Sequence, residues 1–274
     1  MNDRKVSLQV HDLRNLNWTK VRRSSGTAGS FLKASETRKG VHWYYKLSDY
    51  DAYRGIVGHE CVNEIIADRL LTLLNIPHLS YQLLHAKVLI DGAESVTWLC
   101  RSADFKKEGD SKIALDAYYQ MERLPGESPY DFCIRQGWEE YISRMLIIDF
   151  LILNRDRHGA NMEVLRNRAE KTIRLAPLFD HGLSFYFSAH EEKQLAHADP
   201  LSDKRIQCFV GSHSATDNLR LIPVKYRRLS GSLTKESRAV LFADLEDALP
   251  GPWRDAIWEM IWRRWEYYEN FCDS

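Results

Sequence analysis

The feature that most constrains the fold is a long apolar run that ends abruptly in charged and amide side chains. Residues 138–153 read WEEYISRMLIIDFLIL, and the polar stretch NRDRHGAN follows at once, with Asn161 five residues after Asp156. Because the run is apolar on nearly all sides, it predicts a buried helix. A buried helix is a rigid mount, so the polar groups behind it are held firmly enough to take part in chemistry.

Composition limits the classes of protein that the chain can belong to. Its 274 residues and 32.0 kDa suit one large domain or two lobes, and 44% apolar residues can supply a core. Lysine plus arginine and aspartate plus glutamate balance at 38 each, so no overall field draws the chain toward nucleic acid or a membrane. We therefore predict neither nucleic acid nor a membrane as a partner.

The cysteines and the N-terminus indicate the compartment. The 5 cysteines are far apart, without the spacing of a zinc site or a disulfide framework. The N-terminus is polar and lacks the apolar segment of a secretion signal, and the run at 145–153 is too short to span a bilayer. These features predict a cytoplasmic protein.

The chain changes character near Asp104. Before it, SFLKAS, GVHWYYKLS, YQLLHAKVLI and SVTWLCRS read as strands, the last two around a turn at Asp91-Gly92. Residues 59–77 read as one helix that Asn75-Ile76-Pro77 stops. After it, most segments read as helices, including a C-terminal one with Trp258, Trp262 and Trp265 on one face for core packing. We predict an α+β fold of two lobes, a strand-rich lobe at 1–103 and a helical lobe at 104–274.

Phosphoryl transfer requires a phosphate cradle and a well-placed cation, and the first lobe has candidates for both. Gly26 and Gly29 lie among small residues just before a strand, where backbone amides can reach phosphate oxygens, although a hairpin turn explains them equally well. Lys46 ends an aromatic strand, and an acidic helix follows. Glu64 is the preferred partner for this lysine, and Glu60, one turn earlier, is the alternative.

The second lobe offers oxygen ligands in the right order. Asp156 can accept or orient a hydroxyl proton. Asn161, and Asp180 at the end of a short apolar strand in LAPLFDHGLS, can bind a hard cation such as Mg²⁺. The loop with Asp156 and Asn161, taken alone, fits capping and turn groups equally well, and so does the segment with Asp180. The two segments in this order, after a strand lysine and an acidic helix, favour a catalytic site. His158 and His181 are expected to be structural, with His158 bonding backbone near Asp180.

With these residues in place, the chain resembles a known family. NRDRHGAN followed by LAPLFDHGLS is similar to the catalytic loop and metal-binding segment of HipA-like serine/threonine kinases, which are bacterial protein kinases. The loop SSGTAGSFLK, the strand HWYYK and the helix NEIIADRLLTLLNIP follow in the same order as in that family, and the resemblance runs from about Ser24 to Ser184. It implies a protein-kinase-like fold of two lobes, with ATP and Mg²⁺ as cofactors.

The resemblance also implies a role for each matching residue. Asp156 would be the catalytic aspartate, which orients the substrate hydroxyl, and Asn161 and Asp180 would hold Mg²⁺ against the phosphates. Lys46 would contact the phosphates and pair with Glu64. The other implied nucleotide contacts are a loop over the triphosphate, with Ser25, Gly26, Thr27, Ala28, Gly29 and Ser30, and backbone near adenine at the hinge, from Cys100 to Ser102.

The implied partner is a protein that carries a serine or threonine acceptor. Because family members can phosphorylate a serine of the glycine-rich loop, Ser24, Ser25 and Ser30 are candidate autophosphorylation sites. Full-length HipA proteins have a further subdomain before this loop, where this sequence has about 23 residues, so we do not expect their antitoxin-docking and operator-bound assembly here. The loop also departs from the GxGxxG pattern of protein kinases.

Two alternatives remain open at this point. Phosphoinositide kinases share the DRHxxN and DxG arrangement, so the acceptor can be a lipid headgroup or a small alcohol, although the balanced charge speaks against a lipid. A pseudokinase would bind ATP and regulate a partner without transfer. It would be recognised by a lost catalytic group, whereas Lys46, Asp156, Asn161 and Asp180 are all present.

Overall fold

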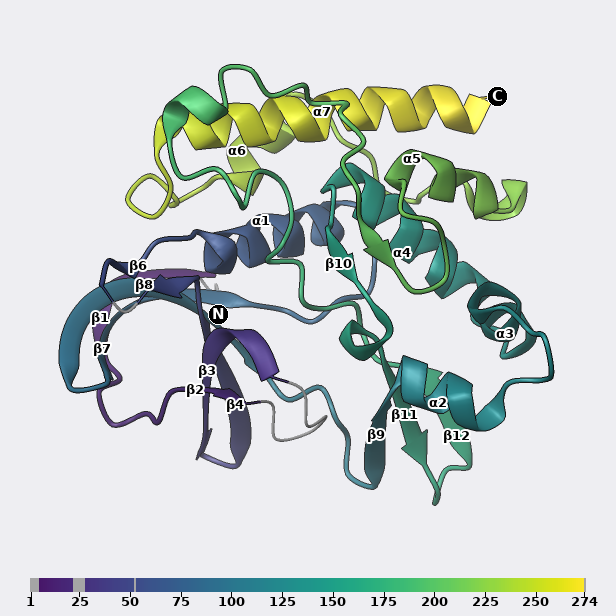
Figure 1. Cartoon of the computed structure of the whole chain (residues 1–274), viewed down its shortest axis with the longest axis horizontal. Coiled ribbons are helices and arrows are strands. Elements are labelled where there is room, and N and C mark those ends of the chain that lie inside the picture. Colours follow the sequence, from purple (N-terminus) through teal and green to yellow (C-terminus); the bar gives the residue numbers. More distant parts are fainter. Residues whose placement is uncertain (1–4, 22–27, 52, 274) are drawn as a thin grey trace.

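The structure, a computed structural model, describes residues 5–21, 28–51 and 53–273, which form a strand-rich lobe and a helix-rich lobe (Figure 1). Six of the described strands form one sheet in the order β1-β7-β8-β4-β3-β2, antiparallel except for β1 beside β7. Their bounds are β1 Val6–Asp12, β2 Thr19–Val21, β3 Ala28–Arg38, β4 Val41–Leu47, β7 Gln82–Ile90 and β8 Ala93–Ala103. A short hairpin of β5 (Tyr50–Asp51) and β6 (Gly55–Ile56) lies between β4 and the first helix.

Two tight turns set the register of this sheet. Lys39-Gly40 joins β3 to β4, and Asp91-Gly92 joins β7 to β8, each with positive φ at both positions. Such turns match the twist of antiparallel strands and favour glycine at the second position. The turn predicted at Asp91-Gly92 is confirmed.

Helix α1 (Glu60–Leu73) lies between the sheet and the helical lobe, in contact with β7, β8 and α6 (Figure 1). Its apolar side chains are buried except for Leu73, which is partly buried, and the polar Asn63 and Glu64 are fully buried. Asn75, with φ of 54°, turns the chain directly after the helix, as predicted from the Asn75-Ile76-Pro77 stop. A helix buried from Glu60 to Leu71 has few ways to shift without losing contacts with both lobes.

The helical lobe also contains a small sheet that the sequence did not predict. Its strands lie in the order β12-β11-β9, with bounds β9 Asp110–Ala114, β11 Glu163–Asn167 and β12 Thr172–Leu175. Because β9 pairs with a strand some fifty residues away, its hydrogen bonds are non-local, and local periodicity gives little sign of them. Asp180 was expected at a strand end, but β12 ends at Leu175 and Asp180 lies in the loop beyond.

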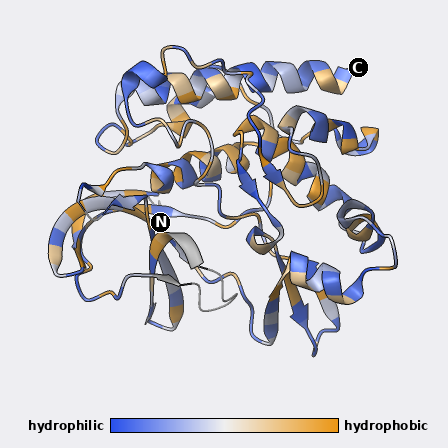
Figure 2. Cartoon of the chain, in the orientation of Figure 1, coloured by the Kyte–Doolittle hydropathy of each residue, from blue (hydrophilic) through white to orange (hydrophobic). Residues whose placement is uncertain are grey.

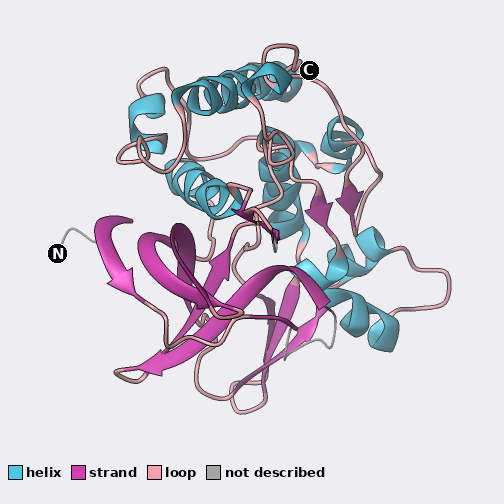
Figure 3. Cartoon of the chain, turned by 60° about the vertical axis from the view of Figure 1, so that its left-hand side comes forward, coloured by secondary structure: helices cyan, strands magenta, loops and turns pink. Residues whose placement is uncertain are grey.

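The other regular elements of this lobe are helices, apart from the two-residue strands β10 and β13, which pair in parallel, and long loops connect them (Figure 3). The predicted buried helix is α4, in which the whole stretch from Met145 to Leu151 is buried. The bounds are α2 Leu115–Glu122, α3 Pro129–Arg135, α4 Glu139–Leu151, β10 Asp156–Arg157, η1 Gly159–Asn161, η2 Glu192–Gln194, β13 Gln207–Cys208, α5 Ala215–Asn218, η3 Leu219–Leu221, η4 Val224–Tyr226, α6 Ser237–Leu241 and α7 Gly251–Asp273.

One large hydrophobic core runs through both lobes. It joins Ile65 of α1, Ile147 of α4 and Ile261 of α7, and Figure 2 shows hydrophobic residues gathered on α1 and α4. Trp258, Trp262 and Trp265 pack against or within this core, as predicted for the closing helix. A second cluster fills the other face of the large sheet. No helix in the described part of the chain is long and apolar enough to cross a membrane.

The C-terminal end of α1 is touched directly by a backbone from the helical lobe, so we predict that Gly231→Ala destabilises the fold. A Cβ at Gly231 would lie 2.2 Å from the carbonyl oxygen of Leu73 and 2.6 Å from the Cα of Leu74. Backbone atoms cannot move aside as a flexible side chain can, so overpacking should cost about 1–3 kcal/mol. The free energy of unfolding in urea measures the effect.

Gly251→Ala is the matched control, because a Cβ there meets nothing within 4 Å and the residue begins α7. Alanine favours a helix, so this variant should be at least as stable as the wild type. Equal stability of the two variants would contradict the close contact at Gly231.

His59, just before α1, is buried in a way that disfavours its charged form. Its Nε2 atom is buried without a hydrogen-bond partner in the described structure, and its ring lies edge-on to Trp253 at 6.5 Å between centroids. Burial, and to a lesser extent the charge of His190, lowers the pKa of His59 from 6.5 to about 4. Between these pH values the unfolded chain binds a proton that the folded chain does not, so His59 reduces stability as pH falls.

We therefore predict that His59→Gln flattens the pH dependence of stability between pH 6.5 and about 4. The slope should decrease by up to about 1.4 kcal/mol per pH unit, the contribution of one proton. Urea unfolding at successive pH values measures it. A wild-type slope in His59→Gln would refute the assignment.

Candidate functional site

The polar stretch behind α4 is fixed by a buried ion pair. Asp149, near the end of α4, accepts two hydrogen bonds from Arg157, Nε to Oδ2 at 2.8 Å and Nη2 to Oδ1 at 2.9 Å. The side chain of Asn154 also donates to Asp149 Oδ1, at 2.9 Å. Burial by itself would lower the pKa of Arg157, but the Asp149 carboxylate outweighs it and raises the pKa. The loop is therefore bound to the helix by charge-assisted bonds with defined geometry.

Arg157 also reaches the segment before Asp180. Its Nη1 donates to the carbonyl oxygen of Phe179 at 2.8 Å, and the backbone N–H of Arg155 donates to the carbonyl of Leu183 at 2.9 Å. These contacts lay the loop at 154–161 beside the segment at 179–183. Sequence reasoning gave neither Arg157 nor Asp149 a role in the site. The available signal was a lone carboxylate, Asp149, inside the apolar run at 145–153, which requires a buried partner.

Asp156 and Asn161 are neighbours across the turn η1. The side-chain amide of Asn161 donates to the carbonyl oxygen of Asp156 at 2.9 Å and to its Oδ2 at 3.3 Å. The Asp156 side chain is 27% exposed, so its carboxylate can meet a ligand. His158 accepts a hydrogen bond from the amide of Ala160 through Nδ1, at 3.2 Å, and thus caps η1 instead of bonding backbone near Asp180 as expected.

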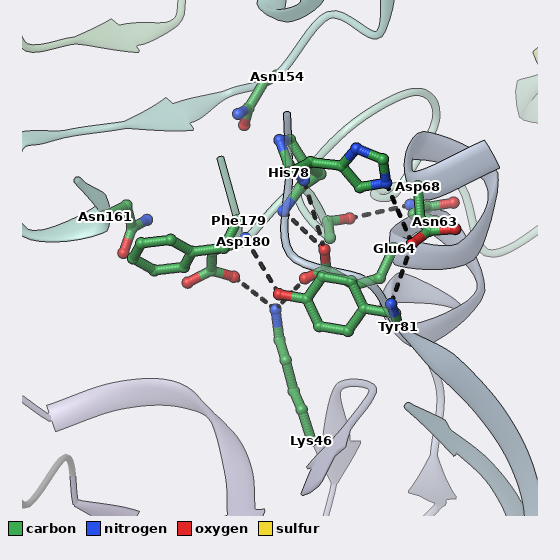
Figure 4. Close-up of polar contacts among 12 residues, drawn as sticks. Lys46, Asn63, Glu64, Asp68, His78, Tyr81, Asn154, Asn161, Phe179 and Asp180 are labelled. Atoms are coloured by element: carbon green, nitrogen blue, oxygen red, sulfur yellow. Dashed lines mark hydrogen bonds and ion pairs between the residues drawn. The ribbon is translucent and has the colours of Figure 1, made fainter. Parts of the chain in front are cut away.

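Lys46 lies between two carboxylates that come from different parts of the chain (Figure 4). Its Nζ donates to Glu64 Oε1 at 2.8 Å and to Asp180 Oδ1 at 2.6 Å. Glu60, the alternative partner, instead accepts the backbone N–H of Asp49 at 3.0 Å. Burial tends to lower the pKa of Lys46, but Asp180 and Glu64 raise it well above its ordinary value, so the amine is charged at neutral pH.

Asp180 is held in an uncommon backbone conformation. Its φ is 59°, in the left-handed region that residues other than glycine adopt at a cost of about 1 kcal/mol or more. Its N–H donates to the hydroxyl of Tyr81 at 3.3 Å, and the N–H of His181 donates to Glu64 Oε2 at 2.8 Å (Figure 4). Glu64 thus contacts both Lys46 and the chain next to Asp180, which fixes the two relative to each other.

The remaining predicted positions lie on strands β3 and β8 or outside the described residues. Ser24, Ser25, Gly26 and Thr27 are not among the residues that the structure describes, and Ala28, Gly29 and Ser30 begin β3. Cys100 lies on β8 opposite Lys46, fully buried, and it pairs with Leu83 on its other side. Ser102, opposite Tyr44, lies past the end of the β7 pairing. The predicted contacts with the triphosphate and adenine therefore stay predictions.

The residues that are brought together fit a magnesium nucleotide. Asn161 and Asp180 supply amide and carboxylate oxygens, the ligands that Mg²⁺ prefers, Asp156 lies beside Asn161, and Lys46 supplies a fixed positive charge. Gly182 keeps the space beside the lysine open, because a Cβ there would lie 3.0 Å from Lys46 Nζ and 3.2 Å from the carbonyl oxygen of Glu60.

Comparison with known proteins shows the fold. The sequence matches no protein-family model and no curated protein. Among solved structures, the chain is similar to the proinflammatory kinase CtkA of Helicobacter pylori, with a TM-score of 0.64 and 13% identity over 96% of this chain and 98% of that one. The fold is therefore the bilobal, kinase-like α+β fold that the sequence predicted.

Two further structures superpose more loosely. HipA of Shewanella oneidensis MR-1, in a toxin–antitoxin complex with HipB and operator DNA, gives a TM-score of 0.44 and 14% identity over 93% of this chain and 67% of that one. WaaP in complex with acyl carrier protein gives 0.39 and 13% identity over 94% and 89%. The likeness to CtkA is the one that establishes the fold.

We predict that Arg157→Ala is strongly destabilising, because it leaves the Asp149 carboxylate buried without its partner. Removing one member of a buried ion pair costs about 3–5 kcal/mol. Denaturant unfolding measures the loss. Arg144→Ala, which breaks an exposed pair with Glu140 on the same helix, should cost about 0.5 kcal/mol or less. If Arg157→Ala lost no more unfolding free energy than Arg144→Ala, the buried pair would not hold the loop.

Proposed function

We propose that the chain is an ATP- and magnesium-dependent kinase of the HipA-like type, which transfers the γ-phosphoryl group to a serine or threonine hydroxyl of a protein. The observation that carries this proposal is the position of the Lys46 ammonium, bonded to both Glu64 and Asp180 beside the loop of Asp156 and Asn161. A lysine on a strand, a glutamate on the adjacent helix and two metal-binding side chains are the parts that phosphoryl transfer needs.

Each residue of the site has a distinct task in this proposal. Asp156, with its partly exposed carboxylate, orients the acceptor hydroxyl and takes up its proton. Lys46 donates hydrogen bonds to phosphate oxygens, while Glu64 holds the ammonium in position. Asn161 and Asp180 would hold Mg²⁺. The bound magnesium nucleotide supplies the phosphoryl group and neutralises the charge that develops during transfer.

The fold supports further parts of the proposal. The lobes at 1–103 and 104–274 would enclose the nucleotide, because β8 ends at Ala103 and the next strand, β9, belongs to the other sheet. The loop at Ser25–Ser30 would cover the triphosphate, and the backbone from Cys100 to Ser102 would approach adenine. A serine of that loop is then the expected site of autophosphorylation.

We predict that Asp156→Asn and Asp180→Ala each abolish phosphoryl transfer, and that only Asp180→Ala strongly weakens the binding of magnesium–ATP. The first change removes the group that orients the hydroxyl, and the second removes a metal ligand. Incubation with γ-labelled ATP and Mg²⁺, followed by intact mass and label incorporation, measures transfer. Calorimetry measures nucleotide binding.

Asp255→Asn is the control, because Asp255 is an exposed carboxylate on α7 paired with Arg238. The Asp255→Asn variant should incorporate label from γ-labelled ATP to the same extent as the wild type. Wild-type transfer in both site variants would show that the site is wrongly assigned. ATP binding without transfer to protein would point to a pseudokinase or a small-molecule acceptor, and absence of ATP binding would refute the kinase function.

A further inference from the structure

Two adjacent residues of α1 hold the segment that follows Asp180. Glu64 Oε2 accepts the N–H of His181 at 2.8 Å. Asn63 Nδ2 donates to the carbonyl oxygens of Gly182 at 2.9 Å and of Ser184 at 3.1 Å. Asn63 and Glu64 are both fully buried, and Figure 4 shows them side by side at the segment. The segment is thus bonded to the helix at three backbone groups between His181 and Ser184.

Burying the side chain of Asn63 costs free energy that an apolar residue at the same position would avoid. Its Oδ1 atom is buried and has no hydrogen-bond partner in the described structure, and the same holds for the hydroxyl of Ser184 beside it. Buried polar atoms are normally paired, and leucine has the same number and branching of side-chain heavy atoms without the polar groups. The amide therefore matters for its two N–H groups, which hold two carbonyls at once.

These contacts complete a set that keeps Asp180 in its left-handed conformation. On the N-terminal side, Arg157 holds the carbonyl of Phe179, and the hydroxyl of Tyr81 accepts the N–H of Asp180 itself. On the C-terminal side, Glu64 and Asn63 hold residues 181–184. A strained residue keeps its conformation only when its surroundings impose it, so the loss of one side should release it.

We propose that Asn63 is a positioning residue for Asp180. By holding Gly182 and Ser184 on α1, it keeps the Asp180 carboxylate directed at Lys46 and at the magnesium site, and it does so without adding charge beside them. Glu64 contacts Lys46 directly, whereas Asn63 acts through the backbone and through Asp180. This inference rests on the proposed function for its link to Mg²⁺, but the holding of the segment can be measured without any nucleotide.

The test compares Asn63→Leu with the wild type in two measurements. The first is the Mg²⁺ concentration that gives half-maximal ATP binding in calorimetry. It should rise at least about tenfold, as is usual when a residue that orients a metal ligand is lost, while ATP binding without Mg²⁺ stays unchanged. The second is hydrogen exchange of the His181 amide in the nucleotide-free protein, which should become faster because the segment opens more readily.

Asn218→Leu is the matched control. Asn218 is a buried amide in the helical lobe that bonds the backbone of a loop in the same manner, accepting the N–H of Ser212 at 2.7 Å and donating to its carbonyl at 3.1 Å. This variant should lose stability but keep the wild-type Mg²⁺ dependence. If it shifted the Mg²⁺ dependence as much as Asn63→Leu, the effect would be general destabilisation and the proposal would be wrong.

The two measurements separate this inference from the proposed function. If the wild type binds no magnesium–ATP, the kinase function fails, and His181 exchange alone then decides whether Asn63 holds the segment. Unchanged exchange and unchanged Mg²⁺ dependence in Asn63→Leu would overturn the inference. If Asn63→Leu does not fold, the smaller Asn63→Ala gives the same two readouts.

Discussion

The contact between one buried ammonium and two carboxylates connects the whole molecule. Lys46 comes from the large sheet, Glu64 from the helix between the lobes, and Asp180 from the loop beyond the small sheet, and all three meet within hydrogen-bond distance. None of these groups could be buried at low cost by itself, because an unpaired charge in the interior is strongly unfavourable. Because each buried charge needs the others as partners, these contacts hold the two lobes in one arrangement. The same arrangement brings together the types of residue that phosphoryl transfer requires.

Two buried helices provide the rigid parts of the site. Helix α4 carries Asp149, whose pair with Arg157 fixes the loop of Asp156, and α1 carries Glu64, which fixes Lys46. Buried ion pairs contribute more to a single defined geometry than to net stability in favourable cases, and here Asp149 and Glu64 both lie at buried positions of their helices. The apolar sides of both helices belong to one core, so a displacement of either would disturb both lobes. The helix between the lobes thus acts as a fixed support in this structure.

The parts of the fold that sequence reasoning reached are those with local signals. The buried helix at 139–151, the helix stopped at Asn75 and the turn at Asp91-Gly92 follow from apolar periodicity and turn chemistry. The small sheet was not predicted, because β9 and β11 pair across a long stretch of chain. The partners of single polar residues were not predicted for the same reason. Asn63 reads as one more polar position in a helix, and only the fold brings it to Gly182 and Ser184.

The most direct test of this account is a crystal structure with Mg²⁺ and a non-hydrolysable ATP analogue. The account predicts phosphate density against Lys46 Nζ, a metal ion bound by Asp180 and Asn161, and α1 in the same place as without ligand. Nucleotide bound elsewhere, or a helix that moves and separates Glu64 from Lys46 when the nucleotide binds, would contradict it.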